Sequence, residues 1–218
     1  MAIIPADEKV FMVDKRTNTT YGGSQALQDM QQWYTMQDVA DSVAAATPYK
    51  VFTTLLTQSG GDSPANANYD NQVPLIIGQS YFIDDNLPLA DGGTDFTNVG
   101  AANNNYGTWF IATGTTPIWG QNNGFLTYNE AAPVATVLEN TIGNVWFTYE
   151  NVGGYGIKSN DLFINNKTLI LSTPFTADNG DVTTNVYFNK SSVNLMNIVV
   201  GDGDSFLNGV PIEIRVYN

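Results

Sequence analysis

Residues 211–217 read Pro-Ile-Glu-Ile-Arg-Val-Tyr, and this stretch decides how the chain is interpreted. Ile212, Ile214 and Val216 alternate with charged side chains, so apolar groups recur at every second position. Because successive side chains of a β-strand point to opposite faces, this period of two is typical of a strand with one buried face. The stretch therefore predicts a half-buried β-strand.

Short runs of the same kind, rich in β-branched and aromatic residues, recur from residue 49 onward. Clusters of Gly, Asn and Asp separate them. The runs are 50–56, 75–83, 108–113, 144–150, 168–172, 183–188, 197–200 and 211–217. Many short strands with turn residues between them favour a β-sandwich or barrel over βαβ units. We therefore expect a mainly β protein whose residues 49–218 form an all-β domain.

Three segments inside this domain need separate interpretation. Residues 121–134 are loop-like and could divide the domain into two subdomains. A single domain is favoured, because small β units are hard to stabilise without disulfides. Residues 131–138 contain Pro133 and are interpreted as loop or strand. The glycine-rich run 153–156 lacks the Lys of a phosphate-binding loop and is interpreted as a turn.

Residues 1–48 are interpreted as an N-terminal arm followed by a short helix. The arm, 1–23, looks extended, with one short strand at 10–13. It is either a flexible terminus or a segment that packs on a neighbour. Residues 24–46 carry the helical pattern, because apolar side chains recur there at spacings of three and four. Thr47 precedes Pro48 and ends the element, since a residue before proline avoids the α region.

A capping box marks a helix start inside this region. The Thr35 hydroxyl and the Asp38 carboxylate would satisfy the first free amides of a helix. A helix with an apolar stripe must bury it, either against its own β domain or against copies of itself. The residues expected to carry attachment or oligomerisation are Phe11, Val13, Trp33, Tyr34, Met36, Val39 and Val43.

Charge and residue usage exclude several classes of function. Charged residues make up 13% of the chain, and 21 acidic against 8 basic residues give a formal charge of −13. Phosphate binding depends on Lys and Arg, so this balance argues against nucleic acid and against an anionic membrane surface as partners. The chain has no Cys and no His, which removes disulfides, Ser–His–Asp and Cys–His catalysis and the usual zinc sites.

The sequence also bears on where the protein works. The N-terminal residues lack a basic region followed by an apolar one, so no secretory signal is expected. No apolar run approaches the roughly 18 residues needed to span a bilayer, so no membrane insertion is expected. We expect a protein made in the cytoplasm that works outside a cell only after assembly into a particle.

The loop 201–205 is a candidate cation site. Asp202 and Asp204 could offer oxygen atoms to one Ca²⁺ ion, which takes about six to eight oxygen ligands. The EF-hand spacing is not met, because Phe206 occupies its third ligand position. Asp-Gly is also ordinary turn chemistry, so a turn is the favoured interpretation. Apart from this possible Ca²⁺ ion, we expect no cofactor.

Two facing carboxylates could hydrolyse a glycosidic bond if one of them had a raised pKa. Most of the available acidic residues lie in turn-like surroundings, where such side chains are solvated or bonded to local amides. We therefore expect no catalytic residues and no enzymatic activity. The acidic residues considered are Asp84, Asp85, Asp91, Asp95, Glu130, Glu139 and Glu150.

Aromatic residues are the remaining candidates for binding. Trp109, Trp119 and Tyr155 could form a platform on which a sugar ring stacks. Aromatic side chains of strands more often fill a core or a subunit interface, which is the favoured interpretation. Their exposure to solvent decides between glycan binding and an architectural role.

A family resemblance lies in the middle of the chain. Residues 94–103 read Thr-Asp-Phe-Thr-Asn-Val-Gly-Ala-Ala-Asn, and residues 107–117 read Gly-Thr-Trp-Phe-Ile-Ala-Thr-Gly-Thr-Thr-Pro. With the preceding Gly-Gln-Ser-Tyr-Phe-Ile at 78–83 and with Trp119, they resemble a β module of structural proteins of tailed-bacteriophage virions, including tail-fibre-like proteins. Residues 9–14 and 33–39 resemble the start of small phage virion proteins.

The resemblance covers roughly half of the chain and brings no catalytic residues with it. It implies a virion component: a capsid decoration, head-fibre or tail-fibre adaptor protein, attached through its N-terminal region and displaying its β domain. The implied partners are its own copies, as a trimer by analogy with fibre-like proteins, and other virion proteins. The alternative is a carbohydrate-binding module that recognises a host surface glycan through exposed aromatic side chains.

Overall fold

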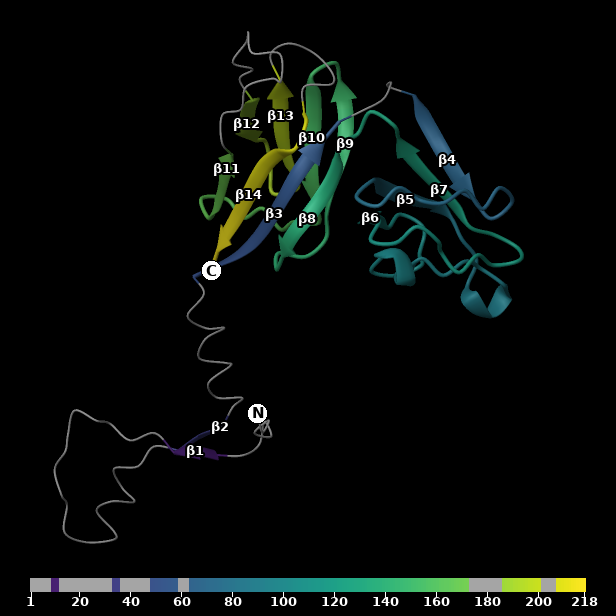
Figure 1. Ribbon diagram of the computed structural model, residues 1–218, viewed down its shortest axis with the longest axis horizontal. Helices are drawn as coiled ribbons and strands as arrows, with labels where there is room; N and C mark the ends of the chain where they lie inside the picture. The colour runs from purple at the N-terminus through teal and green to yellow at the C-terminus, as the bar shows by residue number, and fades with distance from the viewer. Residues whose placement is uncertain (1–8, 12–32, 36–47, 59–62, 173–185, 201–206) are drawn as a thin grey trace, which may run out of the picture. The chain divides into compact units, whose positions relative to one another are not determined.

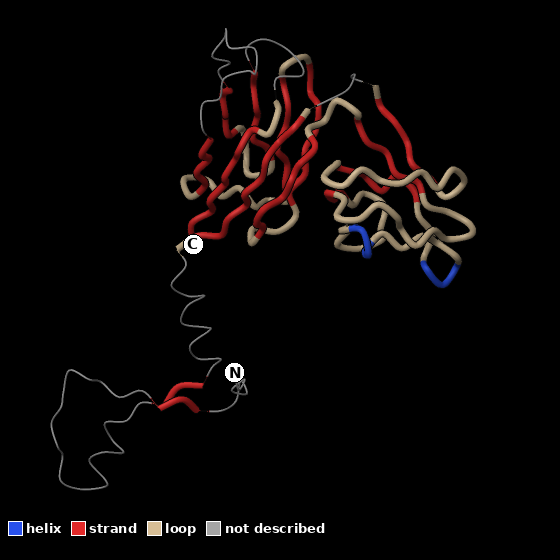
Figure 2. Tube along the Cα trace, viewed as in Figure 1, coloured by secondary structure: helices blue, strands red, loops and turns tan. Residues whose placement is uncertain are grey.

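The computed structural model describes residues 9–11, 33–35, 48–58, 63–172, 186–200 and 207–218 (Figure 1). The chain divides into two compact units, Met1–Pro48 and Tyr49–Asn218. Strands make up most of the regular structure (Figure 2), so the mainly β fold predicted from the sequence is confirmed. Within these described ranges, no helix is long and apolar enough to cross a membrane.

The described residues of the first unit form two short strands, β1 (Lys9–Phe11) and β2 (Trp33–Thr35). They pair antiparallel, with Lys9 opposite Thr35 and Phe11 opposite Trp33. The strand expected at 10–13 is therefore confirmed for its first two residues. Backbone pairing across a long stretch of sequence brings two of the expected attachment positions next to each other.

The helical interpretation of residues 24–46 is wrong for β2. Trp33, Tyr34 and Thr35 are aromatic or β-branched, and such residues favour strands. Pairing with β1 therefore outweighs the apolar spacing that suggested a helix. Phe11, Trp33 and Tyr34 lie on the paired strands. The other expected attachment residues, Val13, Met36, Val39 and Val43, lie outside the described residues.

Two four-stranded antiparallel sheets form a sandwich in the second unit (Figure 1). One sheet has the strand order β11–β14–β3–β8, and the other has the order β12–β13–β10–β9. The bounds of the first sheet are β3 (Tyr49–Thr57), β8 (Val134–Asn140), β11 (Thr168–Ser172) and β14 (Val210–Tyr217). Those of the second are β9 (Val145–Asn151), β10 (Gly154–Ser159), β12 (Val186–Lys190) and β13 (Leu195–Val200).

Strand β14 shows how the alternating pattern builds the core. Ile212, Ile214 and Val216 are buried, whereas Glu213 and Arg215 on the opposite face are partly exposed. Burial of one large aliphatic side chain stabilises the fold by about 2 kcal/mol, so this face is a major source of stability. The same core includes Phe52, Leu56, Phe147, Tyr155, Ile157, Met196 and Ile198 from both sheets.

A third antiparallel sheet, of order β4–β7–β5–β6, forms a separate lobe with its own core. Its sequence lies between β3 and β8, which pair with each other, so this inserted lobe (residues 64–130) interrupts a pair of neighbouring strands. Its strands are β4 (Pro64–Asn68), β5 (Ser80–Asp85), β6 (Trp109–Ile111) and β7 (Phe125–Asn129). The segment between β5 and β6 contains two 3₁₀ turns, η1 (Leu89–Asp91) and η2 (Thr97–Val99).

Contacts between β5, β6 and β9 join the inserted lobe to the sandwich. The buried amide of Phe147 donates a hydrogen bond to the Ser80 hydroxyl, at 2.8 Å. The Trp109 and Trp146 rings lie parallel, at 6° and 6.0 Å between centroids, which is an offset stack. A buried hydrogen bond and a ring stack fix direction as well as distance, so they orient the lobe on the sandwich.

Several expected strands are confirmed, and two interpretations are wrong. The runs 50–56, 168–172 and 211–217 coincide with β3, β11 and β14. The loop-like segment 121–134 contains β7. The glycine-rich turn is confirmed at Gly153 but wrong beyond it, because Gly154–Gly156 belongs to β10. A Cβ on Gly156 would lie 2.6 Å from Thr148 Oγ1 on the neighbouring strand, so glycine permits close packing there.

Replacing Gly78 by alanine is expected to destabilise the second unit. Gly78 has a φ of +88°, and an added Cβ would lie 2.3 Å from the Ala135 carbonyl oxygen. Strain and clash together are expected to lower the free energy of unfolding by about 3 kcal/mol. Urea unfolding of Gly78→Ala measures this loss.

Gly107 supplies a matched control, because its φ is also +88° but nothing lies within 4 Å of an added Cβ. Gly107→Ala should therefore show only the cost of the left-handed backbone, about 1 kcal/mol. Equal losses in the two variants would contradict a steric role for Gly78 at the junction.

Candidate functional site

Side-chain amides rather than charges hold the long segment between β5 and β6. Asn86 Nδ2 donates to the carbonyl oxygens of Thr94, at 2.7 Å, and Asn104, at 3.1 Å. Asn86 Oδ1 accepts a hydrogen bond from the Thr94 amide at 2.9 Å. One uncharged side chain therefore satisfies three backbone groups, which are costly to leave unpaired.

Asp95 stabilises the turn that follows. Its Oδ1 accepts hydrogen bonds from the Thr97 amide (2.9 Å), the Thr97 hydroxyl (2.6 Å) and Asn104 Nδ2 (3.1 Å). These bonds, those from Thr97 above all, hold the pKa of the Asp95 carboxyl below its ordinary value of 3.8. The carboxylate is thus committed to the local backbone, as expected for an acidic residue in a turn.

At one end of the third sheet, strand register brings three distant residues into one row. Phe125, the first residue of β7, pairs with Asn68 at the end of β4 and with Asp85 at the end of β5. A register shift between Ile83 and Asp85 interrupts the ladder at this row. Such irregularities re-aim side chains at the ends of strands. The row therefore gathers an amide, an aromatic ring and a carboxylate.

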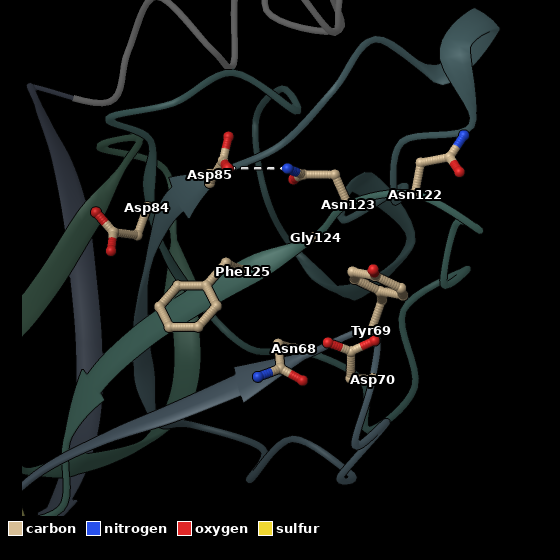
Figure 3. A pocket seen from close by; sticks show the side chains of 9 residues that line it. All are labelled: Asn68, Tyr69, Asp70, Asp84, Asp85, Asn122, Asn123, Gly124 and Phe125. Atoms are coloured by element: carbon tan, nitrogen blue, oxygen red, sulfur yellow. Dashed lines mark hydrogen bonds between the residues drawn. The ribbon is translucent and has the colours of Figure 1, made fainter.

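An open hollow of about 490 Å³ lies at this row, and Figure 3 shows the residues around it. We call it the β4–β7 hollow. Its aromatic members are Tyr69 and Phe125, both half-buried. The Asp85 and Asn123 side chains point toward one another along one part of it (Figure 3). The full lining is Asn68, Tyr69, Asp70, Asp84, Asp85, Asn122, Asn123, Gly124 and Phe125.

Some polar groups of the β4–β7 hollow already make hydrogen bonds within the protein, and others do not. Asn123 Nδ2 donates to Asp85 Oδ2 at 2.8 Å, but Asn123 Oδ1 is buried and accepts no hydrogen bond from the described residues. Within the same described part of the chain, the Asp70 and Asp84 carboxylates have no protein partner. The hollow therefore keeps the Asp70 and Asp84 carboxylates ready for donors from outside.

A divalent cation such as Ca²⁺ needs several oxygen ligands at once. In the described ranges no three acidic side chains lie close enough together to hold a metal ion. The candidate cation residues of the sequence, Asp202 and Asp204, lie outside the described residues, so their Ca²⁺ site stays a prediction. Outside the hollow, Glu150 pairs with Lys158 at 2.8 Å and accepts a hydrogen bond from Thr148, as a structural ion pair does.

A second open hollow, of about 540 Å³, lies on the segment between β5 and β6. Its most exposed aromatic side chain is Tyr106, at 70%, and Leu89 is also exposed. Two of its amides, those of Asn86 and Asn104, already serve the backbone of the segment. This Tyr106 hollow therefore offers fewer free polar groups than the β4–β7 hollow.

The three aromatic residues named as possible glycan contacts do not form an exposed platform. Tyr155 is 1% exposed and belongs to the sandwich core, so its ring is not available to a ligand from solvent. Trp109 lies between Trp146 and Phe82 at the junction. Trp119 packs edge-on against the second core. These rings pack against other side chains, because burying a large aromatic ring stabilises the fold more than leaving it exposed to water.

The aromatic residues of the β4–β7 hollow were not recognised in the sequence. Tyr69 lies between Asn68 and Asp70, and Phe125 follows Asn-Asn-Gly, so both have turn-like neighbours. Strand β4, Pro-Ala-Asn-Ala-Asn, alternates Ala with Asn but contains no β-branched or aromatic residue, so it resembles a turn-rich segment in the sequence. Only the pairing of β4 with β7 brings the two rings to one hollow.

No protein-family model, no curated protein and no solved structure matches this chain. The function is therefore inferred from the sequence and from the geometry described above.

Acid is expected to weaken the fold partly through Asp95. The folded-state pKa of Asp95 lies below its unfolded value, so its contribution is present above pH 3.8 and is lost as pH falls through the folded pKa. Asp95→Asn keeps an oxygen acceptor but removes the titration. Urea unfolding at neutral pH and at about pH 3 should show a smaller acid-induced loss in this variant.

Asp91→Asn serves as the control, because the exposed Asp91 carboxylate accepts no hydrogen bond from the described residues. This variant should retain the acid sensitivity of the parent protein. An acid-induced loss that is unchanged in Asp95→Asn would contradict the role of the Asp95 hydrogen bonds.

Proposed function

We propose that this chain is a structural component of a tailed-phage virion, as a capsid decoration, head-fibre or tail-fibre adaptor protein. Its first unit attaches it to the particle, and its second unit is displayed. The resemblance of residues 78–83 and 94–117 to a β module of such proteins supports the proposal. In this role the protein carries out no catalysis.

The observation that carries the proposal is that both ends of the second unit lie together. Tyr49, which begins β3, pairs with Tyr217, which ends β14, and their ring centroids are 5.3 Å apart. The Arg215 guanidinium lies over the Tyr49 ring at 4.6 Å, a cation–π contact that reinforces this end of the sheet. The first unit joins the second at Tyr49, so this connection lies at one end of the sheet formed by β3 and β14 (Figure 1).

A domain connected at one point can present the rest of its surface, which is what a displayed virion domain requires. The inserted lobe and its two hollows belong to that surface. The segment between β5 and β6 of this lobe is held by hydrogen bonds from side-chain amides, such as those of Asn86 and Asn104, rather than by ion pairs.

Self-association through the first unit is part of the proposal. Components of a particle repeat, and closed symmetry is the rule among oligomers. The expected state is a trimer, by analogy with fibre-like proteins. Phe11, Trp33 and Tyr34, on the paired strands β1 and β2, are the expected contact residues within the described part of this unit.

Light scattering coupled to size-exclusion chromatography tests this assignment. The full chain is expected to have the mass of an oligomer, and a chain that starts at Tyr49 is expected to be a monomer, because the contacts lie in the first unit. Circular dichroism and thermal melting should show that the shortened chain keeps its β fold.

Point variants of the full chain give a second readout. Trp33→Asp should lower the measured mass, because a carboxylate is costly to bury in a contact. Tyr106→Asp, at an exposed position of the second unit, should leave the mass unchanged. A monomeric full chain, or an oligomer that persists without residues 1–48, would contradict attachment of copies through the first unit.

A further inference from the structure

We propose that the β4–β7 hollow is a binding site for an uncharged sugar. The inference goes beyond the architectural role and does not depend on it. It also differs from the glycan platform suggested by the sequence, because it uses Tyr69 and Phe125 instead of residues that serve the cores.

The hollow presents the kind of surface to which a sugar ring binds. A sugar ring has an apolar face of C–H groups and a rim of hydroxyls, so its sites combine an aromatic ring with groups that accept and donate hydrogen bonds. Tyr69 and Phe125 are half-buried and line the same hollow (Figure 3). With a volume of about 490 Å³, the hollow falls within the range of small-ligand sites.

Some polar groups of the β4–β7 hollow make no hydrogen bond within the protein. Asp70 and Asp84 line the hollow and have no protein partner among the described residues. Hydroxyl groups are donors that such oxygens can take up. Asn68 contributes donors as well, because its Oδ1 serves the Asn71 amide while its Nδ2 remains available.

The charge of the residues around the hollow determines which polar ligands it can accept. Among the described residues, three carboxylates line the hollow and no Lys or Arg does, so a phosphate, a sulfate or an acidic sugar would be repelled. A metal ion is disfavoured by the spacing of the acidic groups in the described residues. A cationic ligand would use the carboxylates but leave the amide donors without a role. A neutral sugar can contact the aromatic rings, the carboxylates and the amide donors.

Saturation-transfer difference NMR on the full chain tests the site, because it detects weak ligands of large proteins. The probes are glucose, galactose, mannose, rhamnose and N-acetylglucosamine, each added alone, with N-acetylneuraminic acid as the anionic comparison. At least one neutral sugar is expected to give saturable transfer. The acidic sugar is expected to bind at least about tenfold more weakly, through repulsion by the carboxylates.

Variants place the binding in the hollow. Tyr69→Ala is expected to weaken binding of the same sugar at least about tenfold, because a stacked ring is lost. Asp84→Ala, which removes an acceptor without touching a core residue, should also weaken it. Tyr106→Ala removes the exposed ring of the other hollow and should leave the affinity unchanged. Unchanged thermal melting shows that each variant is folded.

Three results would overturn the proposal. They are the absence of saturable transfer from all five neutral sugars, binding that survives both Tyr69→Ala and Asp84→Ala, and loss of binding in Tyr106→Ala alone. Spermidine that displaces the sugar, or that binds when no sugar does, would show a cation site instead. None of these results bears on self-association through the first unit, so the two proposals can fail separately.

Discussion

The pairing of β14 with β3 is the contact on which the rest of the second unit depends. Every residue of β14 lies opposite a residue of β3, from Val210 opposite Leu56 to Tyr217 opposite Tyr49. This ladder joins the two ends of a unit that spans residues 49–218, and it presents Phe52 and Ile214 to the other sheet. Closing so long a loop costs conformational entropy, which the buried apolar face must offset. Without the ladder, the sheet would divide into the two separate pairs β11–β14 and β3–β8.

The inserted lobe follows from the same arrangement. Since β3 and β8 are neighbours, the chain between them leaves the sandwich and returns to it at one place. A lobe connected in this way can vary without disturbing the sandwich, provided that its junction is kept. Here the junction consists of a close backbone approach at Gly78, the Ser80–Phe147 hydrogen bond and the Trp109–Trp146 stack. The sandwich thus acts as a scaffold that positions loops and hollows, as in many binding proteins.

In the inserted lobe, side-chain amides hold the long segment between β5 and β6 without salt bridges among the described residues. Asn86, Asn104 and Asn123 make contacts that salt bridges would otherwise make, and Asp95 is used as a local acceptor. A net charge of −13 explains the advantage of this choice, because further acidic groups in contact would repel one another. It also leaves the β4–β7 hollow with acceptors in excess of donors. That imbalance underlies the proposed selection of a neutral, hydroxyl-bearing ligand.

The sequence by itself determined the β class of residues 49–218 and the faces of its clearest strands. Ile212, Ile214 and Val216 could be assigned to one buried face, because strand periodicity is a local property of the chain. The turn role of Asp95 was likewise readable from its neighbours. Pairing is not local, and this is where sequence reasoning failed. The strand at Trp33–Thr35, the close packing of Gly156 and the row formed by Asn68, Phe125 and Asp85 all depend on partners far away in the chain. Only the tertiary structure decided which aromatic rings are buried and which line a hollow, because the exposure of a ring depends on the sheet that packs against it.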